Sequence, residues 1–301
     1  MIKLCNVKKC FDGKPAIEDL DLTVESGSIC GIAGSNGAGK STLLRLMTGV
    51  YKQDAGTVTA DGEPVWEDPA VKSRFAYVPD EVLFEPGVNL KSLIKTYKLL
   101  YPSFKGEKCE ALAADFELDM KKSVSSFSKG MKRQVALILA LCRQPDYYFF
   151  DETFDGLDPV MRLRFKNLIN EDVINRGAAA VLTSHSLREF EDVCDRLAII
   201  HKGRIVFEST VDEIKSSVFK VQIAYAEPGD RTFDGLDLLD IKTEGKIYDL
   251  TVRGGKEEIT EYLKKTNPVL LDISPLTLEE FFIYELGSLG YGNKSAEGDA
   301  I

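Results

Sequence analysis

Residues 34 to 42 read GSNGAGKST, and this stretch limits the fold of the 301-residue chain more strongly than any other. The apolar run SICGIA precedes it and KSTLLRLMTGV continues from it, so a strand, a glycine loop and a helix should follow one another. A glycine turn that merely joins a strand to a helix would look similar. The full motif in this setting instead predicts an α/β domain whose backbone N–H groups surround phosphate oxygens.

Lys40 of this loop is expected to bridge the β- and γ-phosphates of a nucleotide, and Ser41 to bind Mg²⁺. Glycines let the loop turn its N–H groups inward, and the helix that follows adds partial positive charge. The expected nucleotide-binding residues of the loop are Gly34, Ser35, Asn36, Gly37, Ala38, Gly39, Lys40, Ser41 and Thr42.

Two adjacent acids, Asp151 and Glu152, close the aromatic run YYFF at residues 147 to 150. An aspartate that ends a strand beside a phosphate loop usually holds the metal ion of the nucleotide, so Asp151 is assigned to Mg²⁺. Glu152 is then placed to polarise a water molecule in line with the γ-phosphate, as a general base. Without the glycine loop, a buried strand that ends in two solvated acids would explain this stretch of sequence equally well.

Strand-like and helix-like segments alternate up to about residue 210, as in an α/β domain. A segment rich in helix-forming and charged residues begins near residue 85 and indicates a helical insertion over about residues 85–140. The insertion lies within a first domain that is expected to cover residues 1–215. Lys202 and Gly203 predict a hairpin turn. The expected strands are residues 2–7, 20–24, 28–33, 147–150 and 179–183.

The chain changes character after this hairpin. FKVQIAYAE, KIYDLTVRG, GKEEITEYLKK, PVLLDIS and TLEEFFIYEL are typical of strand, strand, helix, strand and helix, and Thr277 with Glu280 forms a capping box. Residues 220–287 are therefore expected to form a small α+β appendage, followed by a flexible Gly-rich tail over residues 288–301.

The formal net charge of −10 disfavours a nucleic-acid partner, because no cationic excess is available to neutralise phosphates. No apolar run approaches the ~20 residues of a membrane span, and the N-terminus lacks a secretory signal. We therefore expect a cytoplasmic location. The six cysteines show no CxxC spacing and are expected to be reduced.

Five motifs in this order carry a family resemblance: GSNGAGKST, FSKGMKRQ, YYFFDE, GLDP and TSHS. Over about residues 1–210 the chain resembles the ATP-binding subunits of ABC transporters. The resemblance implies a P-loop ATPase core with an antiparallel β subdomain and a helical insertion. It also implies Mg-ATP as cofactor, a head-to-tail dimer of ATPase subunits around two ATP molecules, and a separate membrane permease as partner.

The resemblance also assigns roles outside the glycine loop. Ser128, Lys129 and Gly130 stand at the signature motif, which contacts the γ-phosphate of ATP held by the partner subunit. Asp158 lies in the loop that links the two ATP sites. Taken alone, Ser-Lys-Gly would be an ordinary helix N-cap.

His185 corresponds to the switch histidine beside Glu152 and the γ-phosphate, and Phe11 to the aromatic that stacks on adenine. Only two histidines occur, and His201 lies instead beside the Lys202-Gly203 hairpin. Without the resemblance, a histidine at a strand end would be taken as structural, and a phenylalanine there as part of the core.

Three departures from the family pattern affect coupling rather than catalysis. Asp80, in YVPDEVLF, stands where an amide usually touches Mg²⁺ and the attacking water, so it is expected at the nucleotide and metal. FSKGM replaces Leu-Ser-Gly-Gly-Gln, as in the branch that serves ABC-2-type exporters. Thr153 and Asp155 replace the common Pro and Ser.

These features together predict an ATP-hydrolysing subunit, peripheral on the inner face of the cell membrane, that powers a separate permease for export. Its permease is expected to dock near DEVLFEPGV. The ATPase dimer could be homodimeric or heterodimeric. The rival is a soluble ABC-type ATPase that remodels DNA or ribosomes, and a third reading is a regulatory nucleotide binder without turnover.

Overall fold

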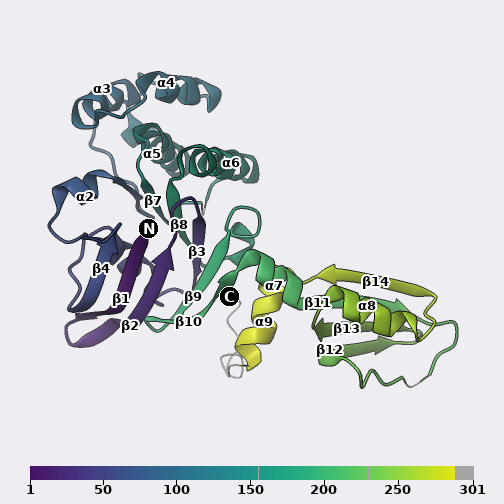
Figure 1. The fold of residues 1–301 in the computed structure, drawn as a ribbon. Coiled ribbons are helices and arrows are strands. Elements are labelled where there is room, and N and C mark those ends of the chain that lie inside the picture. Colours follow the sequence, from purple (N-terminus) through teal and green to yellow (C-terminus); the bar gives the residue numbers. More distant parts are fainter. Residues whose placement is uncertain (155, 230, 289–301) are drawn as a thin grey trace. The chain divides into compact units, whose positions relative to one another are not determined.

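The computed structural model describes residues 1–154, 156–229 and 231–288, and divides into two compact units (Figure 1). The first unit covers Met1–Glu208 and the second begins at Ser209. The expected tail falls largely on residues 289–301, which lie outside the described residues.

A six-stranded sheet forms the centre of the first unit, in the order β10-β9-β3-β8-β7-β6. The pairs β9-β3, β3-β8, β8-β7 and β7-β6 are parallel. The carboxyl ends of β3, β8 and β7 therefore lie side by side, which is where α/β sheets bind ligands. The strands are β3 (Ile29–Ala33), β6 (Phe75–Val78), β7 (Tyr147–Asp151), β8 (Ala179–Ser184), β9 (Arg196–His201) and β10 (Arg204–Thr210).

The four aromatics of β7 alternate between the two faces of this sheet. Tyr147 and Phe149 meet Phe75 edge-on, with ring centroids 5.6 and 5.4 Å apart. Tyr148 and Phe150 stack on each other at 5.7 Å, and the Tyr148 hydroxyl donates to Asp172 of α6 (Pro159–Arg176) at 2.6 Å. A run of large residues buried on both faces is typical of a central parallel strand.

A second, antiparallel sheet has the order β2-β1-β4-β5. Helix α1 (Lys40–Met47) packs Leu43, Leu44 and Met47 into a core shared by residues of both sheets. The strands are β1 (Ile2–Phe11), β2 (Lys14–Val24), β4 (Ala55–Ala60) and β5 (Glu63–Pro64). The helix that begins at the glycine loop is thereby fixed by apolar contacts from two directions.

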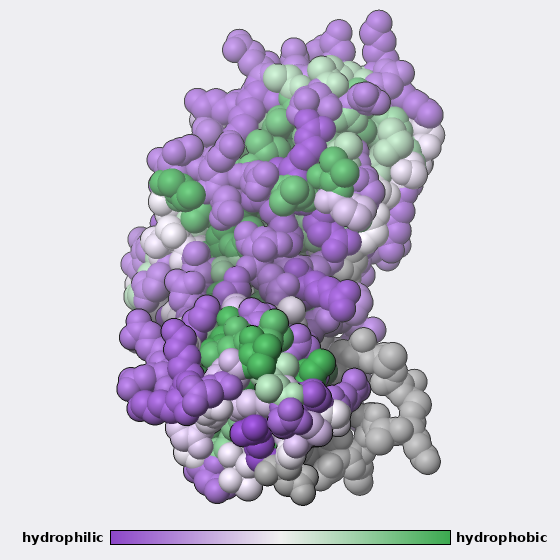
Figure 2. Space-filling model, turned by 90° about the vertical axis from the view of Figure 1, so that its right-hand side faces the viewer, coloured by the Kyte–Doolittle hydropathy of each residue, from purple (hydrophilic) through white to green (hydrophobic). Residues whose placement is uncertain are grey.

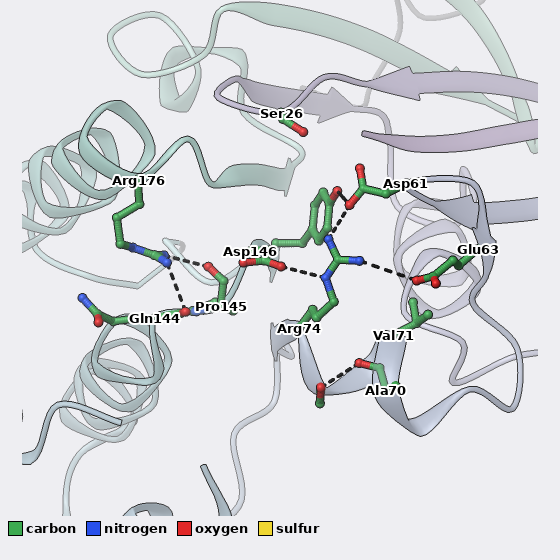
Figure 3. Close-up of polar contacts among 12 residues, drawn as sticks. Ser26, Asp61, Glu63, Ala70, Val71, Arg74, Gln144, Pro145, Asp146 and Arg176 are labelled. Atoms are coloured by element: carbon green, nitrogen blue, oxygen red, sulfur yellow. Dashed lines mark hydrogen bonds and ion pairs between the residues drawn. The ribbon is translucent and has the colours of Figure 1, made fainter. Parts of the chain in front are cut away.

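Arg74 links the edges of these two sheets, just before β6 (Figure 3). Its guanidinium pairs with Asp61, in the turn between β4 and β5, and its Nε donates to Asp146 at 2.7 Å. Tyr147 also donates its hydroxyl to Asp61, at 2.7 Å. The short α2 (Pro69–Ser73) leads into this residue after an Asp68 N-cap.

The helical insertion consists of α3 (Leu90–Leu100), α4 (Gly106–Asp115), the 3₁₀ turn η1 (Val124–Ser126) and α5 (Lys129–Arg143). Helices α5 and α6 lie along one side of the six-stranded sheet, and α3 and α4 lie beyond α5 (Figure 1). The insertion thus brings the start of α5 back to the core.

The second unit is an antiparallel sheet of order β12-β13-β11-β14 with helices α7 (Val211–Ser217), α8 (Lys256–Lys264) and α9 (Leu278–Ser288). Its strands are β11 (Val218–Ala224), β12 (Asp237–Glu244), β13 (Ile247–Arg253) and β14 (Leu270–Pro275). Val221, Ile223, Leu250 and Leu263 belong to its own apolar core.

The predicted fold class is confirmed, and so is each element predicted in the second unit. Glu280 and Thr277 exchange the hydrogen bonds of a capping box before α9. Lys202 and Gly203 both have positive φ, 47° and 77°, as a two-residue hairpin turn requires. The elements that prediction missed include β4, β5, β6, the first part of β2, the helices α2 and α7, and β12. The sequence of β12, DLLDIKTE, is mostly polar and has no fully buried side chain.

All six cysteines are free, and four of them are buried, as expected of structural thiols. No helix in residues 1–154, 156–229 and 231–288 is long and apolar enough to cross a membrane. On the face drawn in Figure 2, apolar side chains lie in small groups separated by polar ones.

Replacing Arg74 with methionine should lower the free energy of unfolding by about 1–2 kcal/mol, because several charged partners lose their donor at once. Arg204→Met is the matched control: this arginine makes one ion pair with Glu18, and both side chains are about half exposed. It should cost less than about 0.5 kcal/mol. Urea unfolding of both variants measures the difference, and equal losses would contradict the linking role of Arg74.

Candidate functional site

The glycine loop leaves the end of β3 and enters α1 at Gly39, whose φ is 115°. A side chain is excluded at two of its glycines: a Cβ on Gly34 would lie 2.5 Å from the Ile200 carbonyl oxygen, and one on Gly39 2.9 Å from that of Ala16. Residues at the tip, Ser35, Asn36 and Gly37, are exposed. The N–H groups of the first helical turn have no intrahelical acceptor, so this end of α1 suits an anion.

Lys40 is buried, with 4% of its surface exposed. Its ammonium donates to the carbonyl oxygens of Gly34 at 2.6 Å and Ser35 at 3.2 Å, and lies 3.0 Å from Oε1 of Glu152. The predicted phosphate-binding lysine and the predicted base are therefore in direct contact.

Asp151 ends β7 as a buried carboxylate that accepts hydrogen bonds from three hydroxyl groups. Ser41 of α1 donates at 3.0 Å, Thr183 of β8 at 2.9 Å and Tyr77 of β6 at 3.1 Å. Burial, together with the nearby negative charge of Asp151, raises the pKa of Tyr77 to about 12, so its phenol stays protonated and donates. Sequence analysis assigned no role to Tyr77 or Thr183, although they begin the quoted segments YVPDEVLF and TSHS.

Glu152 has a φ of 45°, which is unusual for a residue with a side chain. Its N–H donates to both the carbonyl and the hydroxyl oxygen of Thr183, each at 3.1 Å. The Nδ1 atom of His185 lies 3.5 Å from its carboxylate. A strained backbone held by its neighbours is common at functional sites.

The three signature residues lie at the start of α5. Ser128 is its exposed N-cap, and its Oγ accepts from the N–H of Met131 at 3.2 Å. Lys129 is exposed and Gly130 half-exposed. Asp158 is likewise an exposed N-cap, of α6, and accepts from Met161 at 3.0 Å.

The carboxylate of Asp80 lies 2.5 Å from Nη2 of Arg133, a buried residue of α5. Asp80 is thus paired with a cation of α5. Its expected place at the nucleotide and metal stays a prediction.

Phe11 ends β1 with 40% of its surface exposed. Its ring meets Tyr51 edge-on at 5.2 Å, and the ammonium of Lys9 lies 5.4 Å from its centroid. A partly exposed ring can stack on a base, and the assignment of Phe11 to adenine stays a prediction.

The predicted residues of the loop, the Asp-Glu pair and the histidine thus converge at the carboxyl ends of β3, β7 and β8. The hydroxyl oxygen of Ser41 and a carboxylate oxygen of Asp151, both able to bind a metal ion, lie 3.0 Å apart. This pair suits Mg²⁺, which binds proteins through one or two oxygen ligands and takes the rest from phosphates and water.

Comparisons with known proteins identify the family to which the chain belongs. The family model described as "ABC transporter" matches residues 17–155. The ABC transporter ATP-binding protein YtrB of Bacillus subtilis is 29% identical over 95% of this chain and 98% of its own length. The lipopolysaccharide export system ATP-binding protein LptB of Haemophilus influenzae is 31% identical over 69% of this chain and 90% of its own.

Solved structures share the fold of the first unit. An ATP-binding subunit of an ABC transporter has a TM-score of 0.66 and 26% identity, and the match covers 71% of this chain and 92% of that one. A dimeric bacterial ABC transporter cassette has a TM-score of 0.63 with 20% identity, over 70% of this chain and 99% of that one.

The fold and the site therefore define an ATPase of the P-loop class. More narrowly, the chain belongs to the family of ABC transporter ATP-binding proteins. It is an ATP-hydrolysing subunit of a transporter.

Lys40→Ala should lower the affinity for ATP by about 100-fold, because the loss of charge-assisted hydrogen bonds to phosphate is worth up to about 3 kcal/mol. Titration of a fluorescent ATP analogue measures the effect. Lys91→Ala, at an exposed lysine of α3, is the control and should bind as wild type does. Near-wild-type affinity in Lys40→Ala would remove this lysine from the phosphate site.

Proposed function

We propose that this chain binds Mg-ATP at the carboxyl end of β3, hydrolyses it in a site completed by a second ATPase subunit, and drives a separate membrane permease. One observation carries the proposal: Lys40 and Glu152 are 3.0 Å apart, beside a buried Asp151 that already contacts Ser41. These groups are the cation, base and metal ligands that hydrolysis of a phosphoanhydride requires.

Ser41 and Asp151 would hold Mg²⁺, and the metal would supply neutralising charge at the phosphates. Lys40 binds the β- and γ-phosphates together with the N–H groups at the start of α1. Incoming phosphate oxygens compete with Glu152 for the ammonium of Lys40. The Glu152 carboxylate would then be available to orient a water molecule, with His185 beside it.

Lys40, Asp151 and Glu152 all approach the phosphates from one side. The outer face of the γ-phosphate would be left open to water, and a second subunit would cover it. Ser128, at the exposed N-terminus of α5, has the hydrogen-bonding group and helix charge to meet the γ-phosphate of a partner's ATP. The dimeric cassette of similar fold supports this arrangement. The second subunit is either another copy of this chain or a related ATPase.

Glu152→Gln should convert the protein into a stable dimer in the presence of Mg-ATP. The amide keeps the shape of the carboxylate but cannot accept the proton, so uncleaved ATP accumulates between the chains. Turnover should fall at least about 100-fold, within the range of general-base contributions. Size-exclusion chromatography with light scattering measures the dimer, and phosphate release measures turnover.

Adding Ser128→Arg to this variant should return it to a monomer, because a long charged side chain then stands where the γ-phosphate must approach. The matched control is Ser103→Arg, an exposed serine between α3 and α4, which should leave the dimer intact. If Glu152→Gln hydrolyses ATP at the wild-type rate, Glu152 is not the base. If it stays monomeric alone, a related ATPase subunit must be supplied as partner.

The permease would dock at a groove of about 200 Å³ beside the loop that follows β6. Leu83 in this loop is 80% exposed and lines the groove, so it adds apolar surface that a partner could cover. The groove faces the helical insertion and is lined by Val82, Leu83, Phe84, Tyr97, Ala136 and Leu139. Such a site would hold the chain peripherally at the membrane. The FSKGM signature and the likeness to an export-system protein favour export.

The second unit would adjust dimerisation or the choice of partner without taking part in chemistry. In its described residues no group of acids, histidines and cysteines could hold a metal ion. It has its own core.

A chain that ends at Thr210, the last residue of β10, should therefore bind ATP within about twofold of the full chain's affinity. Binding of a fluorescent ATP analogue and circular dichroism test this expectation together. A truncated chain that is folded but does not bind would show that the second unit contributes to the nucleotide site.

A further inference from the structure

Asp80 and Arg133 form an ion pair that the roles described above do not use. Arg133 has 3% of its side chain exposed, whereas Asp80 has 54%. The Nη2 atom of Arg133 donates to both the carboxylate of Asp80, at 2.5 Å, and its backbone carbonyl, at 3.1 Å. A buried guanidinium needs such acceptors, because an uncompensated charge in the interior is costly.

The same arginine also packs against the loop between Glu152 and Asp158. A Cβ on Gly156 of this loop would lie 3.2 Å from Nη1 of Arg133. A Cβ on Gly130 would lie 3.4 Å from the carbonyl oxygen of Gly156. Since Gly130 and Arg133 are three residues apart, they share one face of α5, and this face meets the loop.

We propose that Asp80 is a positioning residue that acts through Arg133, holding the start of α5 against the loop that follows Glu152, and that it is not a ligand of Mg²⁺. Through this pair, the segment after β6 fixes one signature residue, Gly130, relative to Glu152. The proposal rests on the two-subunit site described above. It replaces the metal-binding role that the sequence suggested for Asp80.

Substitutions at Asp80 separate the two roles, when turnover by the purified full chain is measured against free Mg²⁺ at saturating ATP. Asp80→Asn removes the charge opposite Arg133 and should lower kcat about tenfold. The Mg²⁺ concentration for half-maximal rate and the Kd for ATP should both stay within twofold of wild type. Asp80→Glu keeps a carboxylate and should recover most of kcat. Glu81→Gln, at the exposed neighbour, is the control and should behave as wild type.

Arg133 provides a second test. Arg133→Met should lower kcat to a similar extent, and the double variant with Asp80→Asn should be no slower than either single variant, because both changes break one contact. If Arg133→Met does not fold, Asp80→Asn in the Glu152→Gln background serves instead. It should weaken the ATP-bound dimer about tenfold and leave ATP binding unchanged.

A tenfold rise in the Mg²⁺ requirement of Asp80→Asn, with kcat restored at high Mg²⁺, would make Asp80 a metal ligand and overturn the inference. Wild-type kcat in Asp80→Asn would overturn it too, by showing a solvated acid without a role. Failure of the two-subunit function is distinguishable, since it would appear in Glu152→Gln itself as a chain that never dimerises with any ATPase subunit.

Discussion

The buried carboxylate of Asp151 is the constraint on which the site depends. A charge with 1% exposure is tolerated only where hydrogen bonds replace water, and each such bond to a charged group is worth about 1.5–3 kcal/mol. Its donors come from α1, β6 and β8, through Ser41, Tyr77 and Thr183. The three hydrogen bonds that stabilise the Asp151 carboxylate therefore fix α1, β6 and β8 around the end of β7. The glycine loop and the strained Glu152 backbone take their positions from this arrangement.

The strand that carries this charge explains why the acids can lie at the end of so apolar a run. Tyr147 and Phe149 fill the core on one face of the sheet, and Tyr148 and Phe150 fill it on the other. Burial on both faces leaves the carboxyl end as the place where polar groups can emerge. Chemistry at this edge is thus positioned by packing that extends across the whole sheet.

The motifs that sequence analysis identified are local: the residues that act together in each of them are neighbours in the sequence. The glycine loop, the Asp-Glu pair and the capping box at Thr277 are of this kind. The hydrogen bonds from Tyr77 and Thr183 to Asp151 could not be predicted, because both residues also fit an ordinary strand and Asp151 lies far from them in sequence. The contact between Asp80 and Arg133 could not be predicted either, because Arg133 is 53 residues away, on a helix whose buried face the sequence alone does not reveal. Strand β12 was missed because an edge strand needs little apolar pattern.

The dependence of turnover on protein concentration tests the central claim, a site completed by two subunits, most directly. The rate of ATP hydrolysis per chain, measured by phosphate release over a wide dilution series at saturating Mg-ATP, should rise with concentration and level off as dimers form. A rate per chain that stays constant down to the lowest concentration, in protein shown to be monomeric there, would mean that one chain hydrolyses ATP unaided and would contradict the account.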